Sequence, residues 1–437
     1  MKKVALHNLG CKVNSYETEA MQQMLERAGY EIVPFQEGAD VYIINTCSVT
    51  NIADRKSRQM LHRARKMNPD AIVVAAGCYV QAAKEQVEAD DAIDIVIGNN
   101  KKADLIQILE EYERSRNGEA VIDIAHISEY ESLSVDHIGE HTRAFIKVQD
   151  GCNQFCSYCI IPYTRGRVRS RSLQDVLAEA GRLAKNGYQE IVLTGIHLSS
   201  YGIDFPEEER ETLLSLIQAL NKVEGIRRIR LGSLEPRIVT REFVEALAGM
   251  EKICPHFHLS LQSGCAETLK RMNRHYTPDE YLEGCRLLRE HFADAAITTD
   301  VIVGFPGETE EEFEESKRFL ETVHFYEMHV FKYSRRAGTR ADKMPDQVPE
   351  PLKAKRSDEL LTLERKMSEE FRRSFVGRTV EVLFEEETVI EGKTYFGGFS
   401  KEYVRVVVDR DAGVKSGEIR RVKIVGMVSE ECLRGEV

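Results

Sequence analysis

Three cysteines in one short loop are the residues of this chain most able to do chemistry. Cys152, Cys156 and Cys159 follow one another with the spacing C-x3-C-x2-C. Three thiolates at this spacing can hold three corners of an iron–sulfur cube, which leaves the fourth iron open to bind a ligand. A structural zinc site needs a fourth ligand, and no second CxxC or HxxxH follows the loop closely. The loop therefore predicts a cluster that takes part in a reaction.

Disulfide bonds are a poor alternative for these thiols. Lys2 and Lys3 precede an apolar stretch that His7 and Asn8 soon interrupt, so no secretory signal is expected. The thiols are then expected to be reduced and the protein cytoplasmic. No apolar run approaches the roughly 18 residues that cross a bilayer, so no membrane association is expected.

Three further cysteines stand at equivalent places in the first part of the chain. Cys11, Cys47 and Cys78 each come just after a run that is typical of a buried strand. The carboxyl ends of parallel strands meet at one edge of a sheet, so these distant cysteines are expected to converge there. Buried cysteines are also common in strands without such a role. The shared position of all three nevertheless favours a second metal site.

The elements that must position these cysteines indicate an α/β protein of about three domains. Residues 1–125 alternate apolar runs with helical patterns, as in a doubly wound parallel sheet. Residues 138–370 repeat strand, loop and helix, which predicts a partial (β/α)6 barrel with its active site at the loops that follow the strands. The expected strands are Ala144–Val148, Glu190–Thr194, Arg227–Leu231, His256–Leu261, Thr298–Val303 and Met328–Tyr333.

Several helices and a linker can be placed by local signals. Ser172 and Thr309 are each followed three positions later by an acidic residue, which is the spacing of a helix cap. A basic helix is expected over 51–67 and a charged one over 350–373. Few apolar residues occur in series over 126–142, which indicates a linker.

The last part of the chain changes to a strand pattern. Residues 373–437 contain short β-type runs with Gly-bearing turns, which is typical of a small β-barrel of oligonucleotide-binding shape. Aromatic and basic residues here could form a patch for nucleic acid, or the aromatic side chains could belong to the core. The residues of this possible patch are Lys393, Tyr395, Phe396, Phe399, Lys401 and Tyr403.

The overall charge is acidic, but two local runs are basic. The chain has 60 Lys and Arg against 72 Asp and Glu, a net charge of −12, which argues against a general attraction to nucleic acid. One expected helix places Arg55, Arg58, His62 and Arg65 along one face, and residues 160–174 carry four arginines and no carboxylate. A basic ridge beside the expected active edge suits RNA, although solvated helices also carry such runs.

Taken together, these features resemble the methylthiotransferases of the radical S-adenosylmethionine (SAM) superfamily. The segment CNQFCSYCIIPYTRG, from Cys152 to Gly166, is similar to the signature of that family. The resemblance covers essentially the whole chain, and it implies a three-cysteine domain, a radical SAM barrel and a C-terminal TRAM barrel. It also implies two 4Fe–4S clusters, one held by Cys152, Cys156 and Cys159 and an auxiliary one held by Cys11, Cys47 and Cys78.

The resemblance further implies the chemistry. In the family, the open iron binds SAM, and reductive cleavage gives a 5′-deoxyadenosyl radical that abstracts hydrogen from the substrate. The substrate radical then captures a methylthio group from the auxiliary cluster. A second SAM molecule and a reductant of the flavodoxin or ferredoxin type are therefore implied. The rim residues expected to bind SAM are Tyr158, Gly195, Ser233, Gln262, Thr299 and Gly304.

The residues around the first cysteine indicate the target. Branches of the family act on isopentenyl-adenosine in tRNA, on N6-threonylcarbamoyladenosine in tRNA, or on an aspartate of a ribosomal protein. The text from Leu9 to Asn14, LGCKVN, resembles the second branch, and the basic runs favour RNA. This implies 2-methylthiolation of that nucleoside at position 37, in the tRNA anticodon stem-loop. The threonylcarbamoyl carboxylate needs a cation, for which Arg165, Arg167 and Arg335 are candidates.

Two alternatives stay open on the sequence. The same chemistry could act on isopentenyl-adenosine or on the ribosomal aspartate. A protein of another class, an RNA-binding iron–sulfur sensor, would use its clusters to report iron or oxygen without catalysis.

Overall fold

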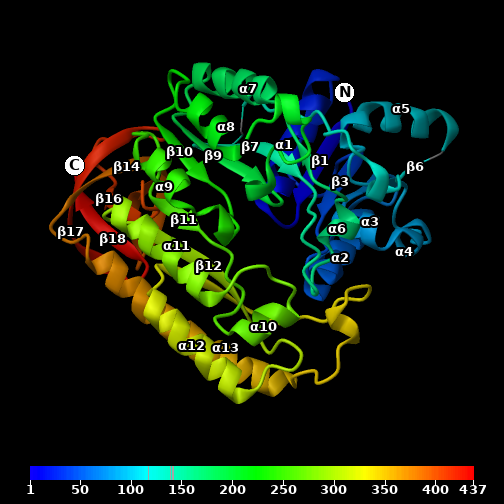
Figure 1. The fold of residues 1–437 in the computed structure, drawn as a ribbon. Helices are drawn as coiled ribbons and strands as arrows, with labels where there is room; N and C mark the ends of the chain where they lie inside the picture. Colours follow the sequence, from blue (N-terminus) through cyan, green and yellow to red (C-terminus); the bar gives the residue numbers. More distant parts are fainter. Residues whose placement is uncertain (117, 138, 140–141) are drawn as a thin grey trace.

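The computed structural model describes residues 1–116, 118–137, 139 and 142–437 of the chain. From the N-terminus to the C-terminus, the chain forms a six-stranded sheet, a partial barrel of strands in two sheets, and a small closed barrel (Figure 1). The linker expected over 126–142 joins the first two, and its residues 138, 140 and 141 lie outside the described residues.

The first sheet is parallel and confirms the doubly wound prediction. Its strands run in the order β2 (Glu31–Ile32), β1 (Lys3–Asn8), β3 (Val41–Thr46), β4 (Ile72–Gly77), β5 (Ile95–Ile97) and β6 (Glu119–Ala120). Apolar side chains of α1 (Lys12–Arg27) and α5 (Leu105–Ser115) cover one face. Those of α2 (Asn51–Met67), α3 (Cys78–Ala82) and α4 (Lys84–Glu88) cover the other.

All six expected barrel strands are present, in two sheets. The four-stranded sheet of the barrel has the order β10 (Arg228–Leu231), β9 (Glu190–Gly195), β7 (Arg143–Asp150) and β8 (Arg169–Ser170), with only β8 antiparallel. The second has the parallel order β11 (His256–His258), β12 (Ala296–Val303) and β13 (Glu327–Lys332). Single bridges from Ile229 to Ile253 and from Leu234 to Leu259 join the two sheets.

Helices cover the outside of the barrel around one large apolar core. They are α7 (Leu173–Lys185), α8 (Leu213–Leu220), α9 (Arg241–Ala248), α10 (Ala266–Arg271), α11 (Pro278–His291), α12 (Glu310–Val323) and α13 (Glu350–Arg373). The short helix α6 (Ile161–Thr164) packs instead against α3. Short 3-10 turns occur at Lys102–Asp104, Ile124–His126, Leu198–Ser200, Glu207–Glu209, Pro236–Ile238 and Ala341–Lys343.

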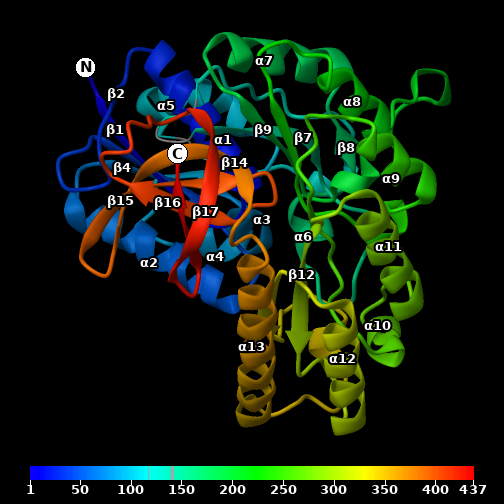
Figure 2. The same cartoon turned by 90° about the vertical axis from the view of Figure 1, so that its left-hand side faces the viewer.

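The helix signals read from the sequence act as predicted. Ser172 accepts a hydrogen bond from a backbone N–H in the first turn of α7, and Thr309 forms a complete capping box on α12. The helices expected over 51–67 and 350–373 are α2 and α13. α13 packs against α12 and leads into the C-terminal barrel (Figure 2).

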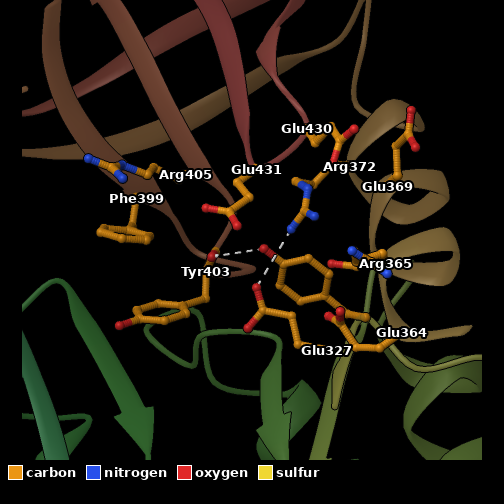
Figure 3. Close-up of a pocket in the computed structure, with 12 residues that line it drawn as sticks. Glu327, Glu364, Arg365, Glu369, Arg372, Phe399, Tyr403, Arg405, Glu430 and Glu431 are labelled. Carbon is orange, nitrogen blue, oxygen red and sulfur yellow. Dashed lines mark hydrogen bonds and ion pairs between the residues drawn. The ribbon is translucent and has the colours of Figure 1, made fainter. Parts of the chain in front are cut away.

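The C-terminal part is a closed barrel, as predicted. Its order is β14 (Thr379–Ile390), β15 (Lys393–Ser400), β16 (Arg405–Asp409), β18 (Cys432–Glu436) and β17 (Ile419–Ser429). Ala296 and Tyr326 of the central part belong to its core cluster, so the two parts share a packed contact. Beside this contact, α13, β13 and the barrel surround a cavity of about 230 Å³ rich in glutamate and arginine side chains (Figure 3).

The aromatic side chains of the possible nucleic-acid patch are used in packing, Tyr395 and Phe396 within the C-terminal barrel and Phe399 and Tyr403 against the central barrel. Tyr403 stacks on Phe399, with ring centroids 4.6 Å apart, and on His256 of β11 at 4.9 Å. The guanidinium groups of Arg143 and Arg230 lie over the Tyr403 ring, at 5.0 and 4.8 Å. For Phe399 and Tyr403 the predicted nucleic-acid patch was wrong, because these two rings fasten the C-terminal barrel to the amino ends of the central strands.

No helix in the described part of the chain is both long and apolar enough to cross a membrane.

Candidate active site

The loop that carries the motif cysteines, Cys152, Cys156 and Cys159, leaves the carboxyl end of β7 as predicted. Neighbouring backbone holds the loop: the Ser157 N–H donates to the Met272 carbonyl at 2.9 Å. Within the loop, Phe155 has φ +50°. A left-handed non-glycine residue costs free energy, and such residues cluster at functional sites.

The motif cysteines line one cavity with residues from other parts of the barrel. Tyr158, Ser233 and Gln262, three of the residues expected to bind SAM, line the same cavity. Gln262 follows β11 with φ +73°. The regular strand ends at His258, before Leu261, the predicted limit, although Gln262 still forms a single bridge with Val301 of β12. The loops after the strands thus form the rim of a single site.

The three other expected SAM residues lie outside the lining of this cavity. The Thr299 hydroxyl donates to the Leu259 carbonyl at 2.6 Å, which ties β12 to the chain after β11. A Cβ on Gly304 would lie 2.3 Å from a side-chain carbon of Lys353 in α13, so glycine is required there by helix packing. Gly195 comes directly before two lining residues and can act through its backbone.

Arg274 is a lining residue that the sequence interpretation missed. Its Nη1 donates to the Cys156 Sγ at 3.3 Å, and its Nε donates to the Tyr276 hydroxyl at 3.0 Å. Arg274 lies between α10 and α11, so no strand signal points to it. Glu235 also lines the cavity, and it could have been found because it follows β10 as Ser233 does.

The motif cysteines fit a metal cluster by their chemistry. Burial, together with the neighbouring Cys156 thiol, raises the pKa of the Cys152 thiol to about 11 and that of the Cys159 thiol to about 12. Such thiols stay protonated at neutral pH until a metal displaces the proton. Arg274 then supplies a positive charge and a hydrogen bond to one thiolate. Three ligands of this kind suit an iron–sulfur cluster with one open corner.

The auxiliary cysteines, Cys11, Cys47 and Cys78, converge as predicted. They follow β1, β3 and β4, which are neighbours in the sheet. Burial, together with the nearby thiols of Cys78 and Cys11, raises the pKa of the Cys47 thiol to about 11. A Cβ on Gly10 would lie 2.9 Å from the Cys47 Cβ, so the missing side chain lets the first two cysteine loops approach each other.

Two asparagines brace these loops. The Asn14 Nδ2 donates to the Leu9 carbonyl at 2.7 Å and to the Thr46 carbonyl at 2.9 Å, next to the first two auxiliary cysteines. The Asn99 Nδ2 donates to the Cys78 Sγ at 3.5 Å and to the Thr164 carbonyl at 2.7 Å. The second asparagine links the auxiliary site to α6, which directly follows the motif cysteines and packs beside α3 (Figure 1).

A buried ion network joins the first sheet to the barrel behind the cysteines. Glu17 of α1 pairs with Arg165 at 2.8 Å, with Lys147 at 2.7 Å and with Lys102 at 3.0 Å. Asp150 pairs with Arg165 at 3.1 Å and with Lys147 at 2.6 Å. All five side chains are almost fully buried. Burial alone would raise the pKa of Glu17, but Arg165, Lys102 and Lys147 hold it well below its ordinary value.

The network carries more positive than negative charge next to the auxiliary cysteines. It joins two carboxylates to four cations, because buried Arg169 also lies 3.8 Å from Asp150. The guanidinium of Arg165 interacts electrostatically with the thiols of Cys11, Cys47 and Cys78. An anionic cluster bound there would complement that excess. The auxiliary cysteines therefore also fit an iron–sulfur cluster.

The arginine run at 160–174 is therefore not a surface for RNA. Arg165, Arg169 and Arg171 are buried, and Arg171 pairs with Glu179 at 2.5 Å. The prediction from this run was wrong because its partners lie elsewhere in the sequence. Arg165 is likewise unavailable to a substrate carboxylate, whereas Arg167 is exposed and stacks over the Phe155 ring at 4.7 Å. Arg335 pairs with Asp342 at 3.0 Å.

Two family descriptions match the chain. The radical SAM superfamily matches residues 146–320, which include the motif cysteines. The uncharacterized protein family UPF0004 matches residues 3–98, which include the auxiliary cysteines. Among solved structures, the radical S-adenosylmethionine methyltransferase TsrM from Kitasatospora setae shares the fold, with a TM-score of 0.57, 16% identity and coverage of 76% of this chain and 73% of that one.

Curated relatives are similar over nearly the whole chain. The threonylcarbamoyladenosine tRNA methylthiotransferase MtaB of Bacillus subtilis (strain 168) is 42% identical, covering 97% of this chain and 94% of that protein. The MtaB of Aquifex aeolicus (strain VF5) is 41% identical over 90% and 95%. The tRNA-2-methylthio-N(6)-dimethylallyladenosine synthase of Thermoanaerobacter sp. (strain X514) is 38% identical over 99% and 88%. The chain therefore belongs to the radical SAM methylthiotransferase family.

Proposed function

We propose that this protein converts N6-threonylcarbamoyladenosine at position 37 of tRNA to its 2-methylthio derivative. The observation that carries the proposal is the pairing of two cysteine triplets, one after β7 and one after β1, β3 and β4, joined by Asn99 and the buried ion network. The MtaB proteins named above are similar over nearly their full length, which supports the choice of nucleoside.

The cysteines would hold the two clusters, and other residues would set their surroundings. When bound, the clusters and SAM supply a carbon-centred radical and a methylthio group. Arg274 would keep a hydrogen bond on the Cys156 thiolate. SAM would contact Tyr158, Ser233 and Gln262 in the cavity that these residues line with the motif cysteines. Glu235 would accept a hydrogen bond from a polar group of SAM. Gly195, Thr299 and Gly304 would shape this cavity through the backbone.

The three parts of the chain would divide the work. Residues 1–125 would form the auxiliary-cluster domain, 138–370 the radical SAM core and 373–437 a TRAM domain. The tRNA anticodon stem-loop would be the partner, and an electron donor of the flavodoxin or ferredoxin type would reduce the cluster held by the motif cysteines. A cytoplasmic location would keep the thiols reduced.

The direct test is anaerobic incubation of the reconstituted protein with SAM, a reductant and an anticodon stem-loop that carries N6-threonylcarbamoyladenosine. Nucleoside mass analysis is expected to show the 2-methylthio product together with 5′-deoxyadenosine. Formation of 5′-deoxyadenosine without that product would reject the substrate. Absence of both would favour the iron–sulfur sensor.

A second candidate is methylthiolation of N6-dimethylallyladenosine, because the Thermoanaerobacter relative is 38% identical over 99% of this chain. A stem-loop with that nucleoside belongs in the same assay. If the protein prefers this stem-loop over the one with N6-threonylcarbamoyladenosine, methylthiolation of N6-dimethylallyladenosine becomes the leading function. If the target is instead the ribosomal protein aspartate, the methylthio group is expected on the ribosomal protein and on neither stem-loop.

The exposed cations of α2 are expected to bind the tRNA backbone. Arg55, Lys56, Arg63 and Lys66 are exposed and have no ion pair among the described residues. Arg55→Ala with Arg63→Ala is expected to weaken binding and to lower the slope of log affinity against log salt by about one for each lost phosphate contact. Fluorescence anisotropy with a labelled stem-loop at several salt concentrations measures this slope.

The control for this test is Arg286→Ala. Arg286 is an exposed arginine on α11 that pairs weakly with Glu283, at 3.9 Å. An unchanged salt slope in the α2 double variant, equal to that of the control, would mean that the tRNA approaches from another side.

A further inference from the structure

The inner side of the barrel is polar where β11, β12 and β13 line it. The ligand-type atoms of His258, Asp300 and His329, on β11, β12 and β13, lie within 4.8 Å of one another. The His258 Nε2 is 3.2 Å from the Asp300 Oδ2, and its Nδ1 is 3.0 Å from the Thr298 hydroxyl. The ring of His329, an exposed residue, stacks on His258 at 5.8 Å. An apolar group placed here would cover polar atoms without replacing their contacts with water.

Lys12 enters the same region from the first sheet. It is the first residue of α1 and directly follows Cys11. Its ammonium group lies within electrostatic reach of Arg230 and Arg143 and of His256, the residue that precedes His258 on the inner side of β11. Lys12 therefore lies beside an auxiliary cysteine and within electrostatic reach of the inner side of the barrel.

Lys12 differs from its neighbours in having no partner. Arg230 donates to Glu190 at 2.8 Å and to the Lys401 carbonyl at 2.9 Å, and Arg143 pairs with Glu385 at 2.7 Å. Lys12 is exposed and has no hydrogen bond or ion pair among the residues that the structure describes. The two guanidinium groups beside Lys12 already have their own acceptors. Binding of an anion to Lys12 is therefore favourable, because it reduces the repulsion among the three cations.

Two of the cations first considered for a substrate carboxylate are engaged elsewhere, and the third stacks on a ring of the motif loop. Arg165 belongs to the buried ion network, Arg335 pairs with Asp342 and Arg167 stacks on Phe155. Arg274 holds the Cys156 thiol and the Tyr276 hydroxyl. Lys12 is left as a cation that is both free and adjacent to an auxiliary cysteine.

We infer that Lys12 binds the carboxylate of the threonylcarbamoyl group and selects this nucleoside over one with an apolar substituent at N6. The inference rests on the proposed function and adds the residue that reads the substrate. An ammonium–carboxylate contact is a charge-assisted hydrogen bond, which is stronger than one between neutral groups. A dimethylallyl group would leave Lys12 without a partner, which is the kind of mismatch that enzymes discriminate against most strongly.

The test compares two substrates in one competition. One stem-loop carries N6-threonylcarbamoyladenosine, and the other carries the same nucleoside with the carboxylate converted to a carboxamide. The wild-type protein is expected to favour the free acid in kcat/KM by about 10- to 100-fold, and Lys12→Met is expected to abolish this preference. Lys12→Arg is expected to retain it. Because both substrates compete in one sample, the ratio does not depend on how many protein molecules carry clusters.

Two further readouts separate this role from a structural one. Anisotropy binding of the two stem-loops, measured without SAM, is expected to show the same loss of preference in Lys12→Met. Lys84→Met, a surface substitution on α4, is the matched control and is expected to behave as wild type.

The outcomes distinguish the inference from the function. If the wild-type protein modifies neither stem-loop, the proposed function is wrong. If it modifies the free acid and Lys12→Met keeps the wild-type ratio of acid to amide, the function stands and the role of Lys12 is rejected.

Discussion

Cys156→Ala is expected to abolish both cleavage of SAM and formation of the methylthio-nucleoside, whereas Cys47→Ala is expected to abolish only the second. Cys156 lines the cavity with Tyr158 and Gln262 and accepts the hydrogen bond from Arg274. Cys47 lies among the auxiliary thiols, beyond that cavity. The separation of the two sites therefore predicts that radical formation survives the loss of the auxiliary cluster.

The measurement is anaerobic turnover with separate quantification of 5′-deoxyadenosine, methylthio-nucleoside and iron. The reconstituted wild-type protein is expected to hold about eight irons, and each variant about four. Cys285→Ala is the control, because Cys285 is buried in the core on α11 and away from both sites. Methylthio product from Cys47→Ala would show that the auxiliary site is not the source of the sulfur.

Local signals were enough to predict the frame that carries these cysteines. α2 and α13 have the predicted bounds, and Thr50 caps the first of them with its side chain. The auxiliary cysteines could be grouped from one sequence because each follows a strand by the same rule. The rule holds because parallel strands end at one edge, whatever their order in the sheet.

Contacts between distant parts of the chain could not be predicted in this way. Arg165 reads as a solvated cation in a basic run, yet its partner Glu17 is 148 residues away in sequence and both are buried. Tyr403 could equally have been a base-stacking residue, and only the docking of the C-terminal barrel places it on His256. The role of a charge or a ring depends on which surface covers it, and periodicity does not contain that information.

The residues of the cavity show the same division. Ser233 and Gln262 follow strands and were found, whereas Arg274 stands between two helices and was missed. Thr299 follows the strand pattern as well as they do, but its hydroxyl is used by the Leu259 carbonyl. Strand phase predicts which end of the barrel a residue occupies. It does not predict whether its side chain faces the cavity or the neighbouring strand.

Glu17→Gln is expected to cause the largest loss of stability of any single substitution in the ion network. The change removes one of two carboxylates and leaves Arg165, Lys147 and Lys102 buried with Asp150 alone. Uncompensated buried charge of this kind costs about 3–5 kcal/mol in free energy of unfolding. Chemical denaturation followed by circular dichroism measures the loss. Glu26→Gln is the control, since this exposed residue of the same helix makes only surface contacts, with Gln22 and, at 3.6 Å, with His137.

The pH dependence separates the charge of Glu17 from its shape. The pKa of Glu17 is held well below its ordinary value in the folded protein, so the unfolded chain binds more protons as the pH falls below about 4.3. The stabilisation by this carboxylate is therefore complete at neutral pH and declines in acid. The gap in stability between the wild-type protein and Glu17→Gln is expected to stay constant from pH 7 to about 5 and to narrow as the pH falls below about 4.3. A gap that stays constant down to about pH 3 would mean that Glu17 stabilises the junction by packing alone.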